Sequence, residues 1–194
     1  MTALLIPLAF AQTGWTGWGG NIFNNRWARE TSVSSESVHT LKQHCQLGGF
    51  AHGISAAPAL HNHVVYFPSW NGLMTAYDYE DCEVKWQTNI SAYLEQYSAP
   101  SAYQAAFTSP VSRTSPQIDG DVLYIGTLRY ALLLALDINT GSVLAHTVVN
   151  THPLAIVTMS PTFYRGIVFV GAASGEEQAT VDPVSLIKSG AERC

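Results

Sequence analysis

Two adjacent carboxylates, Glu176 and Glu177, follow a strongly apolar segment at residues 167–171 (IVFVG) and a small-residue stretch at residues 172–175 (AASG). An apolar run rich in β-branched residues that ends in small residues is typical of a buried strand leaving its sheet. Carboxylate oxygens suit a hard cation such as Ca²⁺, and a glycine beside them lets the backbone approach a flat ligand. The alternative is an ordinary solvated loop, which is the usual fate of an acidic pair.

Two further side chains could bind oxygen atoms of a ligand. Arg113 lies in residues 111–116 (VSRTSP), and its planar guanidinium can donate to two oxygens at once. Thr158 lies in residues 155–161 (AIVTMSP) and carries a hydroxyl group. The alternatives are a surface ion pair for Arg113 and an ordinary β-branched strand residue for Thr158.

Composition narrows the classes of function. The chain has 194 residues, of which 47% are hydrophobic and 12% charged, so it can bury a sizeable core. The formal net charge is -5 without a cluster of Lys or Arg, which makes a nucleic acid an unexpected partner. No run of about eighteen apolar residues occurs, so no membrane span is expected. A Gly-x-Ser-x-Gly elbow is absent, and the spacing of His61 and His63 gives little support for a metal site.

The N-terminal residues and the cysteines bear on export. Residues 1–11 (MTALLIPLAFA) form a short apolar segment ending in Ala-Phe-Ala, which we interpret as a candidate signal peptide, against the alternative of an N-terminal strand. Asn89 begins a glycosylation sequon. If the chain is exported, Cys45 and Cys82 are the pair that we expect to oxidise.

The elements that must position these residues belong to a repeated unit. Each copy opens with a short stretch that ends in proline, and an aromatic residue follows eight positions later. The pairs are Pro58 and Tyr66, Pro116 and Tyr124, and Pro161 and Phe169. The apolar segments of the copies are residues 64–68, 73–78 and 84–89, then 122–126, 130–137 and 142–149, then 167–171.

Turn residues such as Asn71-Gly72 and Asp119-Gly120 separate these segments, as in strands joined by hairpins. Units of about four strands predict an all-β fold, a partial β-propeller of about two and a half four-stranded blades; an irregular β-sandwich is the alternative. The sole helix of note expected is a short turn within residues 35–44. We expect a candidate signal peptide at residues 1–11, an incomplete propeller domain at residues 12–179, and a divergent or truncated tail at residues 180–194.

The ends of the units carry a family pattern. Residues 135–141 (ALDINTG) resemble the A-x-D-x-x-T-G-x-x-x-W signature of quinoprotein propellers, eight-bladed enzymes that use pyrroloquinoline quinone (PQQ), with Ala145 at the tryptophan position. In the first copy Asp81-Cys82 replaces Thr-Gly, and the pattern falls on Ala76, Asp78 and Trp86. The motif implies a tight hairpin and a tryptophan that docks between adjacent blades.

An N-terminal block, residues 17–27 (GWGGNIFNNRW), resembles the W-x-x-x-G-G-N-x-x-x-x-R segment of the same family. The resemblance covers about residues 15–179. Within the family, the chain is most similar to the polyvinyl-alcohol-dehydrogenase-like proteins, and it looks like an N-terminal fragment of such a protein.

The resemblance implies roles for the polar residues. Arg113 stands at the place of an arginine beside the cofactor's carboxyl or quinone oxygens, and Thr158 at the place of a cofactor-binding threonine. Residues 174–177 correspond to a Ser-Gly-Ala-Glu run, which assigns Ser174 and Gly175 to the cofactor and Glu177 to a Ca²⁺ ion that polarises the quinone. Glu176 is then expected to point away, into solvent or towards a second ligand.

Three departures from the pattern concern the chemistry. The adjacent cysteines that flank the cofactor in some members are absent, their region reading Phe-Thr-Ser-Pro at residues 107–110. A glutamate expected before Pro58 is replaced by residues 53–57 (GISAA). The family's catalytic aspartate and further calcium ligands belong to later blades, so no catalytic residue is assigned here.

The resemblance predicts a secreted oxidoreductase that uses PQQ and Ca²⁺ to oxidise an alcohol or polyol to a carbonyl compound, with an electron acceptor that the sequence does not specify. The alternative is a non-enzymatic propeller that binds a protein or a glycan, because a fold does not fix its chemistry.

Overall fold

The computed structural model describes residues 14–20, 24–27, 33–50 and 52–181, so the candidate signal peptide and nearly all of the tail lie outside the described residues. Within these ranges no helix is both long and apolar enough to span a bilayer. In chain order the elements are β1 (Gly14–Trp15), a 3₁₀ turn η1 (Val38–Thr40), β2 (Ala59–His61), β3 (Val64–Pro68), β4 (Leu73–Asp78), β5 (Glu83–Asn89), α1 (Ile90–Tyr97), α2 (Ala102–Phe107), β6 (Gln117–Asp119), β7 (Val122–Gly126), β8 (Leu132–Asp137), β9 (Val143–Val148), β10 (Ala155–Ile156), β11 (Thr162–Tyr164), β12 (Ile167–Phe169), β13 (Ala173–Ser174) and α3 (Glu176–Val181).

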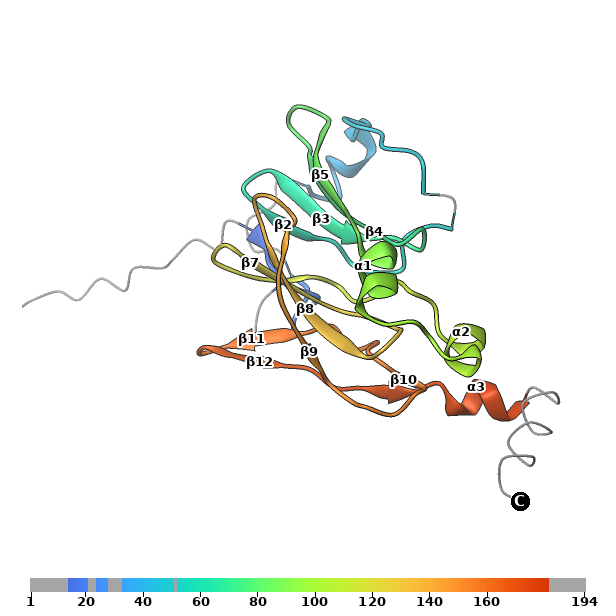
Figure 1. Cartoon of the computed structure of the whole chain (residues 1–194). Coiled ribbons are helices and arrows are strands. Elements are labelled where there is room, and N and C mark those ends of the chain that lie inside the picture. The colour runs from blue at the N-terminus through green and yellow to red at the C-terminus, as the bar shows by residue number, and fades with distance from the viewer. Residues whose placement is uncertain (1–13, 21–23, 28–32, 51, 182–194) are drawn as a thin grey trace, which may run out of the picture.

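The strands form successive antiparallel meanders, as the repeat predicts (Figure 1). Blade 1 is β2-β3-β4-β5, with β1 added along β2; blade 2 is β6-β7-β8-β9. The β11-β12 hairpin begins a third blade, and β10 pairs separately with β13. Blades 1 and 2 carry a bulge at the same place, after Ala76 paired with Trp86 and after Ala135 paired with Ala145. The all-β partial propeller is therefore confirmed, including strands throughout the second copy.

The core lies between the facing surfaces of blades 1 and 2. Alternation along β8 buries Leu132, Leu134 and Leu136 completely, because every second side chain of a strand points to the same face. These leucines pack with Met74 and Ala76 of β4 in one cluster. Neighbouring sheets thus bury each other's apolar faces, which is how propeller blades gain stability.

Trp86 of β5 docks on the turn of the next blade. Its indole Nε1 donates to the carbonyl oxygen of Ile138 at 2.9 Å, and Thr88 Oγ1 donates to the carbonyl oxygen of Gly141 at 2.6 Å. Gly141 has φ +73°, and a Cβ there would lie 2.5 Å from a Trp86 ring carbon. A glycine is therefore required by both backbone and space. The predicted docking of a tryptophan between blades is confirmed for Trp86.

The turn under the indole is built on Asp137. Its carboxylate accepts the backbone N–H groups of Thr140 at 2.8 Å and Asn139 at 2.9 Å. The bond from Thr140 lowers the pKa of Asp137 most; burial opposes the shift, and the bond from Asn139 adds to it. An aspartate that bonds the backbone two and three residues ahead fixes a tight turn.

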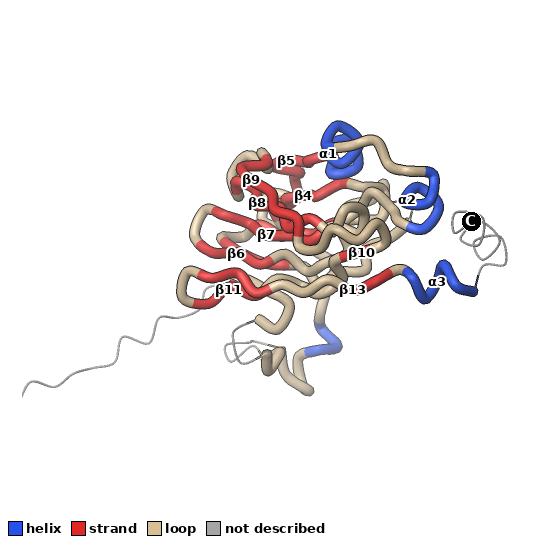
Figure 2. The backbone as a smooth tube through the Cα atoms, turned by 60° about the horizontal axis from the view of Figure 1, so that its bottom comes forward, coloured by secondary structure: helices blue, strands red, loops and turns tan. Residues whose placement is uncertain are grey.

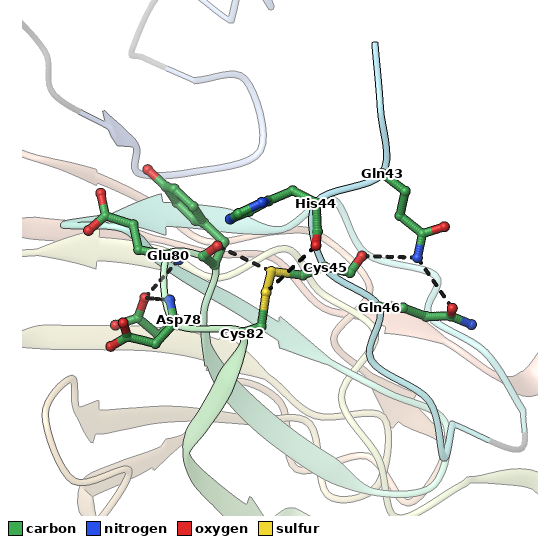
Figure 3. The surroundings of a disulfide bond; sticks show 9 residues. Gln43, His44, Cys45, Gln46, Asp78, Glu80 and Cys82 are labelled. Atoms are coloured by element: carbon green, nitrogen blue, oxygen red, sulfur yellow. Dashed lines mark hydrogen bonds between the residues drawn. A yellow bond between two sulfur atoms is a disulfide. The ribbon is translucent and has the colours of Figure 1, made fainter.

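Blade 1 keeps the same turn with a different residue in the glycine position. Asp78 accepts the N–H groups of Glu80 and Asp81, as Asp137 does in blade 2. Cys82 adopts φ +58°, a left-handed conformation that costs a non-glycine residue about 1–2 kcal/mol. A disulfide joins Cys82 to Cys45 across 37 residues, confirming the predicted pairing (Figure 3). Closing a loop of this length stabilises by about 4 kcal/mol in the chain-entropy account, more than the strain of Cys82.

The residues that precede the repeated prolines link the blades near their first strands. The backbone N–H of Ala57 donates to Ser115 Oγ at 2.9 Å, and the backbone N–H of Ser115 donates to Ser160 Oγ at 3.0 Å. Each pre-proline residue thus donates to its counterpart in the next copy. This serine chain explains the serines before Pro116 and Pro161, whose hydroxyls accept these bonds.

Three helices were not expected from the sequence. The 3₁₀ turn at residues 38–40 fits the short turn predicted there, but α1, α2 and α3 contradict the expectation that this was the sole helix of note. Asn89 caps α1 by accepting the N–H of Ala92, and Ser101 forms a capping box with Gln104 of α2. Both caps are readable in the sequence, but each helix is only six to eight residues long and gives little periodicity.

Replacing Gly141 with alanine should destabilise the protein by about 2–4 kcal/mol, because the new Cβ meets Trp86 and adopts a left-handed φ. Gly120 is the matched control: its φ is +54°, yet nothing lies within 4 Å of the Cβ position. Gly120→Ala should cost only about 1–2 kcal/mol. Urea unfolding followed by circular dichroism measures both, and equal losses would rule out the indole contact as the cause.

The Asp137 turn should make stability depend on pH in acid. The folded pKa of Asp137 lies below its usual value, so this stabilisation is complete above about pH 4 and is lost as pH falls through the folded pKa. Asp137→Asn keeps an oxygen acceptor that does not titrate, so its unfolding free energy should fall less between pH 5 and 2 than that of the unaltered protein. Asp121→Asn, in an exposed turn position, serves as the control and should keep the original pH profile.

Candidate functional site

Three backbone segments carry the predicted site residues, and backbone hydrogen bonds join them edge to edge with the β7-β8 loop. Leu128 N–H donates to the carbonyl of Val111, which joins the segment of Arg113 to the β7-β8 loop. Val157 N–H donates to the carbonyl of Thr127, which joins that loop to the segment of Thr158. Gly175 N–H donates to the carbonyl of Leu154 at 2.7 Å, which adds the Ser174–Glu177 run. The segments lie at the end of the blades where α2 and α3 sit (Figure 2).

Arg113 is exposed between two buried residues, Ser112 and Thr114. Thr114 fixes the segment, because its Oγ1 accepts the N–H of Gly126 at 2.9 Å. No ion pair of Arg113 with a described residue is present, so the alternative of a surface salt bridge is not what the structure shows. Its guanidinium is available to a ligand.

Thr158 follows β10, is half-buried and lines a cavity of about 770 Å³. The cavity lies between the N-terminal segment and the first strands of blades 2 and 3. Its wall combines aromatic with polar side chains, among them Trp18, Asn24, Asp119, Thr158 and Phe163. Arg113, Ser174, Gly175 and Glu177 do not line it. Of the five predicted site residues, only Thr158 therefore lies at this cavity.

The N-terminal segment is a wall of the cavity because Gln117 holds it. The Gln117 side-chain amide donates to the carbonyl oxygens of Thr16 and Ile118, each at 3.0 Å, and Ile118 N–H also donates to Thr16 at 2.7 Å. Gly17 packs directly on this amide, where a Cβ would lie 2.4 Å from Gln117 Oε1. Part of the family-like N-terminal block thus stands at the cavity, with Arg26 stacked 3.8 Å over the ring of Trp18.

The two carboxylates of the acidic pair have different surroundings. Glu176 accepts a 2.6 Å hydrogen bond from Ser174 Oγ and lies 3.4 Å from His152 Nε2. Glu177, in the first turn of α3, is exposed, and its carboxylate has no partner among the described residues. Glu176 is exposed, in keeping with the expectation that it points into solvent, and it contacts Ser174 and His152 there. Of the two, Glu177 is the carboxylate that is open to a ligand.

Gly175 allows a close approach of three segments. A Cβ at this position would lie 3.3 Å from the carbonyl oxygen of Leu154 and 3.9 Å from that of Phe107. Gly175 therefore lies beside Phe107, the first of residues 107–110, where the resemblance leads us to expect adjacent cysteines.

Arg129 is a site residue that the sequence reasoning missed. It is buried on the β7-β8 loop, and its Nη2 donates to the carbonyl of Thr108 at 2.7 Å while Nε donates to Thr108 Oγ1 at 3.3 Å. It lies within an apolar strand repeat, and no motif singled it out. A charged residue between two strongly apolar runs, residues 122–126 and 131–136, was the available signal.

The residues present fit a cation and a quinone in part. Glu177 supplies one open carboxylate, but the only group of three or more potential ligands among the described residues is His44 with the disulfide-bonded Cys45 and Cys82. Ca²⁺ takes six to eight oxygen ligands, so Glu177 can serve as one member of a larger set. Gly175 and the exposed Arg113 suit a flat ligand rich in oxygen atoms.

These features define a partial β-propeller fold with polar residues where its blades end. Three solved structures share its fold at 19% identity: quinohemoprotein alcohol dehydrogenases from Comamonas testosteroni (TM-score 0.65, 83% of this chain) and Pseudomonas putida (0.69, 84%), and a europium-containing methanol dehydrogenase (0.67, 85%). The chain spans only 23–28% of their lengths. No family model and no curated protein matches the sequence. The predicted resemblance to quinoprotein dehydrogenases is thus confirmed as a shared fold.

Replacing Gln117 with alanine should loosen the cavity wall. The change removes two hydrogen bonds that hold the carbonyls of Thr16 and Ile118, at a cost of about 1–2 kcal/mol in unfolding free energy. Hydrogen exchange at residues 14–20 should accelerate more than exchange in β8. Asp119→Asn, on the same strand, is the control and should leave exchange in residues 14–20 unchanged; equal acceleration in both variants would contradict the assignment.

Proposed function

We propose that this chain contributes the first part of the cofactor site of a PQQ-dependent dehydrogenase that oxidises an alcohol or polyol to the carbonyl compound. The observation that carries the proposal is the backbone hydrogen bonding that joins three segments through the β7-β8 loop: the segment of Arg113, the segment of Thr158, and the segment of Gly175 and Glu177. The shared fold with quinohemoprotein alcohol dehydrogenases and a methanol dehydrogenase supports it. The chain spans about a quarter of these structures, so the oxidation itself is proposed only for a protein that also supplies the remaining blades.

Each residue has a role that its surroundings permit. Arg113 donates to carboxyl or quinone oxygens, which an exposed guanidinium without an acidic partner can do. Gly175 allows a ring to approach the backbone, and Glu177 offers its carboxylate to Ca²⁺ or a similar hard cation. Thr158 and Ser174 supply hydroxyl groups. When bound, PQQ supplies the two-electron acceptor that no side chain of the protein provides.

Ser174 and His152 position the acidic pair. By engaging Glu176 they fix the first turn of α3 and leave Glu177 as the open member. The N–H of Glu176 also donates to Ser174 Oγ at 3.1 Å, so Ser174 both donates to Glu176 and accepts from it. In this proposal Ser174 therefore has two roles: it orients the turn that carries Glu177, and it offers its hydroxyl to the cofactor.

Export supports the same assignment. The Cys45–Cys82 disulfide favours an oxidising compartment, in which such bonds persist. Together with the apolar residues 1–11, it supports a secreted protein.

A binding module without catalysis is the second candidate. The cavity of about 770 Å³ contains only Thr158 of the predicted cofactor residues, and its exposed Trp18 and its polar rim would suit a glycan. In this case the polar end of the blades would bind neither quinone nor cation.

Calcium-dependent binding of PQQ to the full chain separates the two candidates. Glu177→Gln should weaken it by about tenfold or more, since a metal ligand is lost, whereas Glu176→Gln should change it less than about threefold. The shift of the quinone absorbance on titration measures the affinity, and Eu³⁺ luminescence reports the cation directly. Equal effects of the two variants, or no PQQ binding with any cation, would argue for the binding module.

A further inference from the structure

The charge of Arg129 is buried without a counter-charge. The residue is 8% exposed, and no carboxylate of the described residues lies within 4.0 Å of its guanidinium. An unpaired ion away from water carries an effective penalty of several kcal/mol. Buried arginines are therefore normally paired, and this one has only the neutral oxygens of Thr108.

Part of the guanidinium is still free to bind. Thr108 takes Nε and one N–H of Nη2, and a guanidinium has five N–H donors, so three have no acceptor among the described residues. Every fully buried side-chain nitrogen and oxygen of these residues has a hydrogen-bond partner. The Nη1 donors of Arg129 therefore reach accessible space, and with the outer Nη2 donor they form one open edge of the fork.

The loop holds Arg129 rigidly and under strain. Thr127 Oγ1, which is fully buried, donates to the carbonyl of Arg129 at 2.8 Å and accepts the N–H of Leu132 at 3.0 Å. Tyr130 (φ +65°) and Ala131 (φ +45°) are both left-handed, which costs about 1–2 kcal/mol each. Strain of this kind collects at ligand-binding sites, where it pre-organises a side chain.

We propose that Arg129 anchors an anion-binding site for a ligand carboxylate. A carboxylate matches the open edge of the guanidinium with two parallel N–H···O bonds and supplies the missing counter-charge. Phe107 and Thr108 place Arg129 in the neighbourhood of Gly175, since Arg129 bonds Thr108 and Gly175 lies beside the Phe107 carbonyl. The inference goes beyond the proposed function, because it needs neither quinone nor metal.

Side-chain NMR of the full chain tests the site with oxalate as the probe. With ¹⁵N-labelled arginine, the Nε–Hε resonance that Arg129→Lys removes should shift and saturate as oxalate is added at constant ionic strength. The resonance of Arg165, an exposed arginine over Tyr164 on the β11-β12 turn, should not shift and serves as the internal control. Affinity for oxalate, measured on a backbone amide of residues 107–108, should fall about tenfold in Arg129→Lys, which keeps the charge but loses the fork.

The control variant Arg165→Lys should bind oxalate as the unaltered protein does. An Arg129 resonance that does not move, or equal oxalate affinities in Arg129→Lys and the unaltered protein, would overturn the proposal. If Arg129→Lys unfolds, Thr108→Val provides the second test. It removes the Oγ1 partner of Nε together with the bond from Oγ1 to the carbonyl of Gln104, and the Arg129 resonance should still shift and saturate as oxalate is added.

Competition identifies the source of the carboxylate. If PQQ displaces oxalate from Arg129, the cofactor is the ligand; if it binds without displacing oxalate, a separate small carboxylate is. If Glu177→Gln lowers the affinity for PQQ but leaves the affinity for oxalate unchanged, the two sites are independent. Failure of the proposed function would thus leave this inference intact, and the reverse also holds.

Discussion

The contact between Trp86 and the turn at Gly141 is the constraint on which the arrangement of the blades depends. The indole bonds the carbonyl of Ile138 and lies so close to Gly141 that a single carbon atom does not fit between them. Position 141 of the turn beneath the indole must therefore be a glycine with a left-handed backbone. Asp137 holds that turn by accepting two backbone N–H groups. Three residues spaced along two blades thus fix the angle between two sheets, which apolar packing alone, being non-directional, would leave adjustable.

The same solution is not used at the next junction. Ala145 stands where the tryptophan would be, and blade 2 meets the third copy instead through Gly126, where a Cβ would lie 2.2 Å from Val157. The serine chain runs through both junctions, since Ala57 donates to Ser115 and Ser115 to Ser160. A hydrogen-bonded thread near the first strands is therefore common to all three copies, while the outer contact varies.

Sequence reasoning reached the fold because the repeat carries its own redundancy. The spacing of Pro58, Pro116 and Pro161 gave the blades, and the A-x-D pattern gave the turn that Asp137 builds. It identified Cys45 and Cys82 as a pair but did not explain why a cysteine replaces the glycine of the turn. The structure shows that Cys82 adopts the left-handed backbone conformation that the glycine has in blade 2, and that the disulfide forms from this position. The short helices were missed because six to eight residues show too little hydrophobic periodicity to indicate a helix. A capping box such as that of Ser101 is not sufficient by itself, since helices this short depend on packing in the folded protein. Arg129 was missed because burial of a charge is a tertiary property.

The distribution of strain argues that the polar end of the blades is specified for binding. Cys82 also adopts a left-handed conformation, but a disulfide offsets its cost, and the other left-handed hairpin residues, such as Asn62 and His63, lie in exposed two-residue turns that require this backbone. Tyr130 and Ala131 have no such offset in covalent chemistry, and beside them Arg129 adds the penalty of an unpaired charge. If stability alone mattered, a glycine in place of Tyr130 or Ala131 would relieve backbone strain, and a methionine in place of Arg129 would remove the unpaired charge. The presence of both the strain and the charge where the segments of Arg113, Thr158 and Gly175 converge is accounted for when a bound anion stabilises the loop.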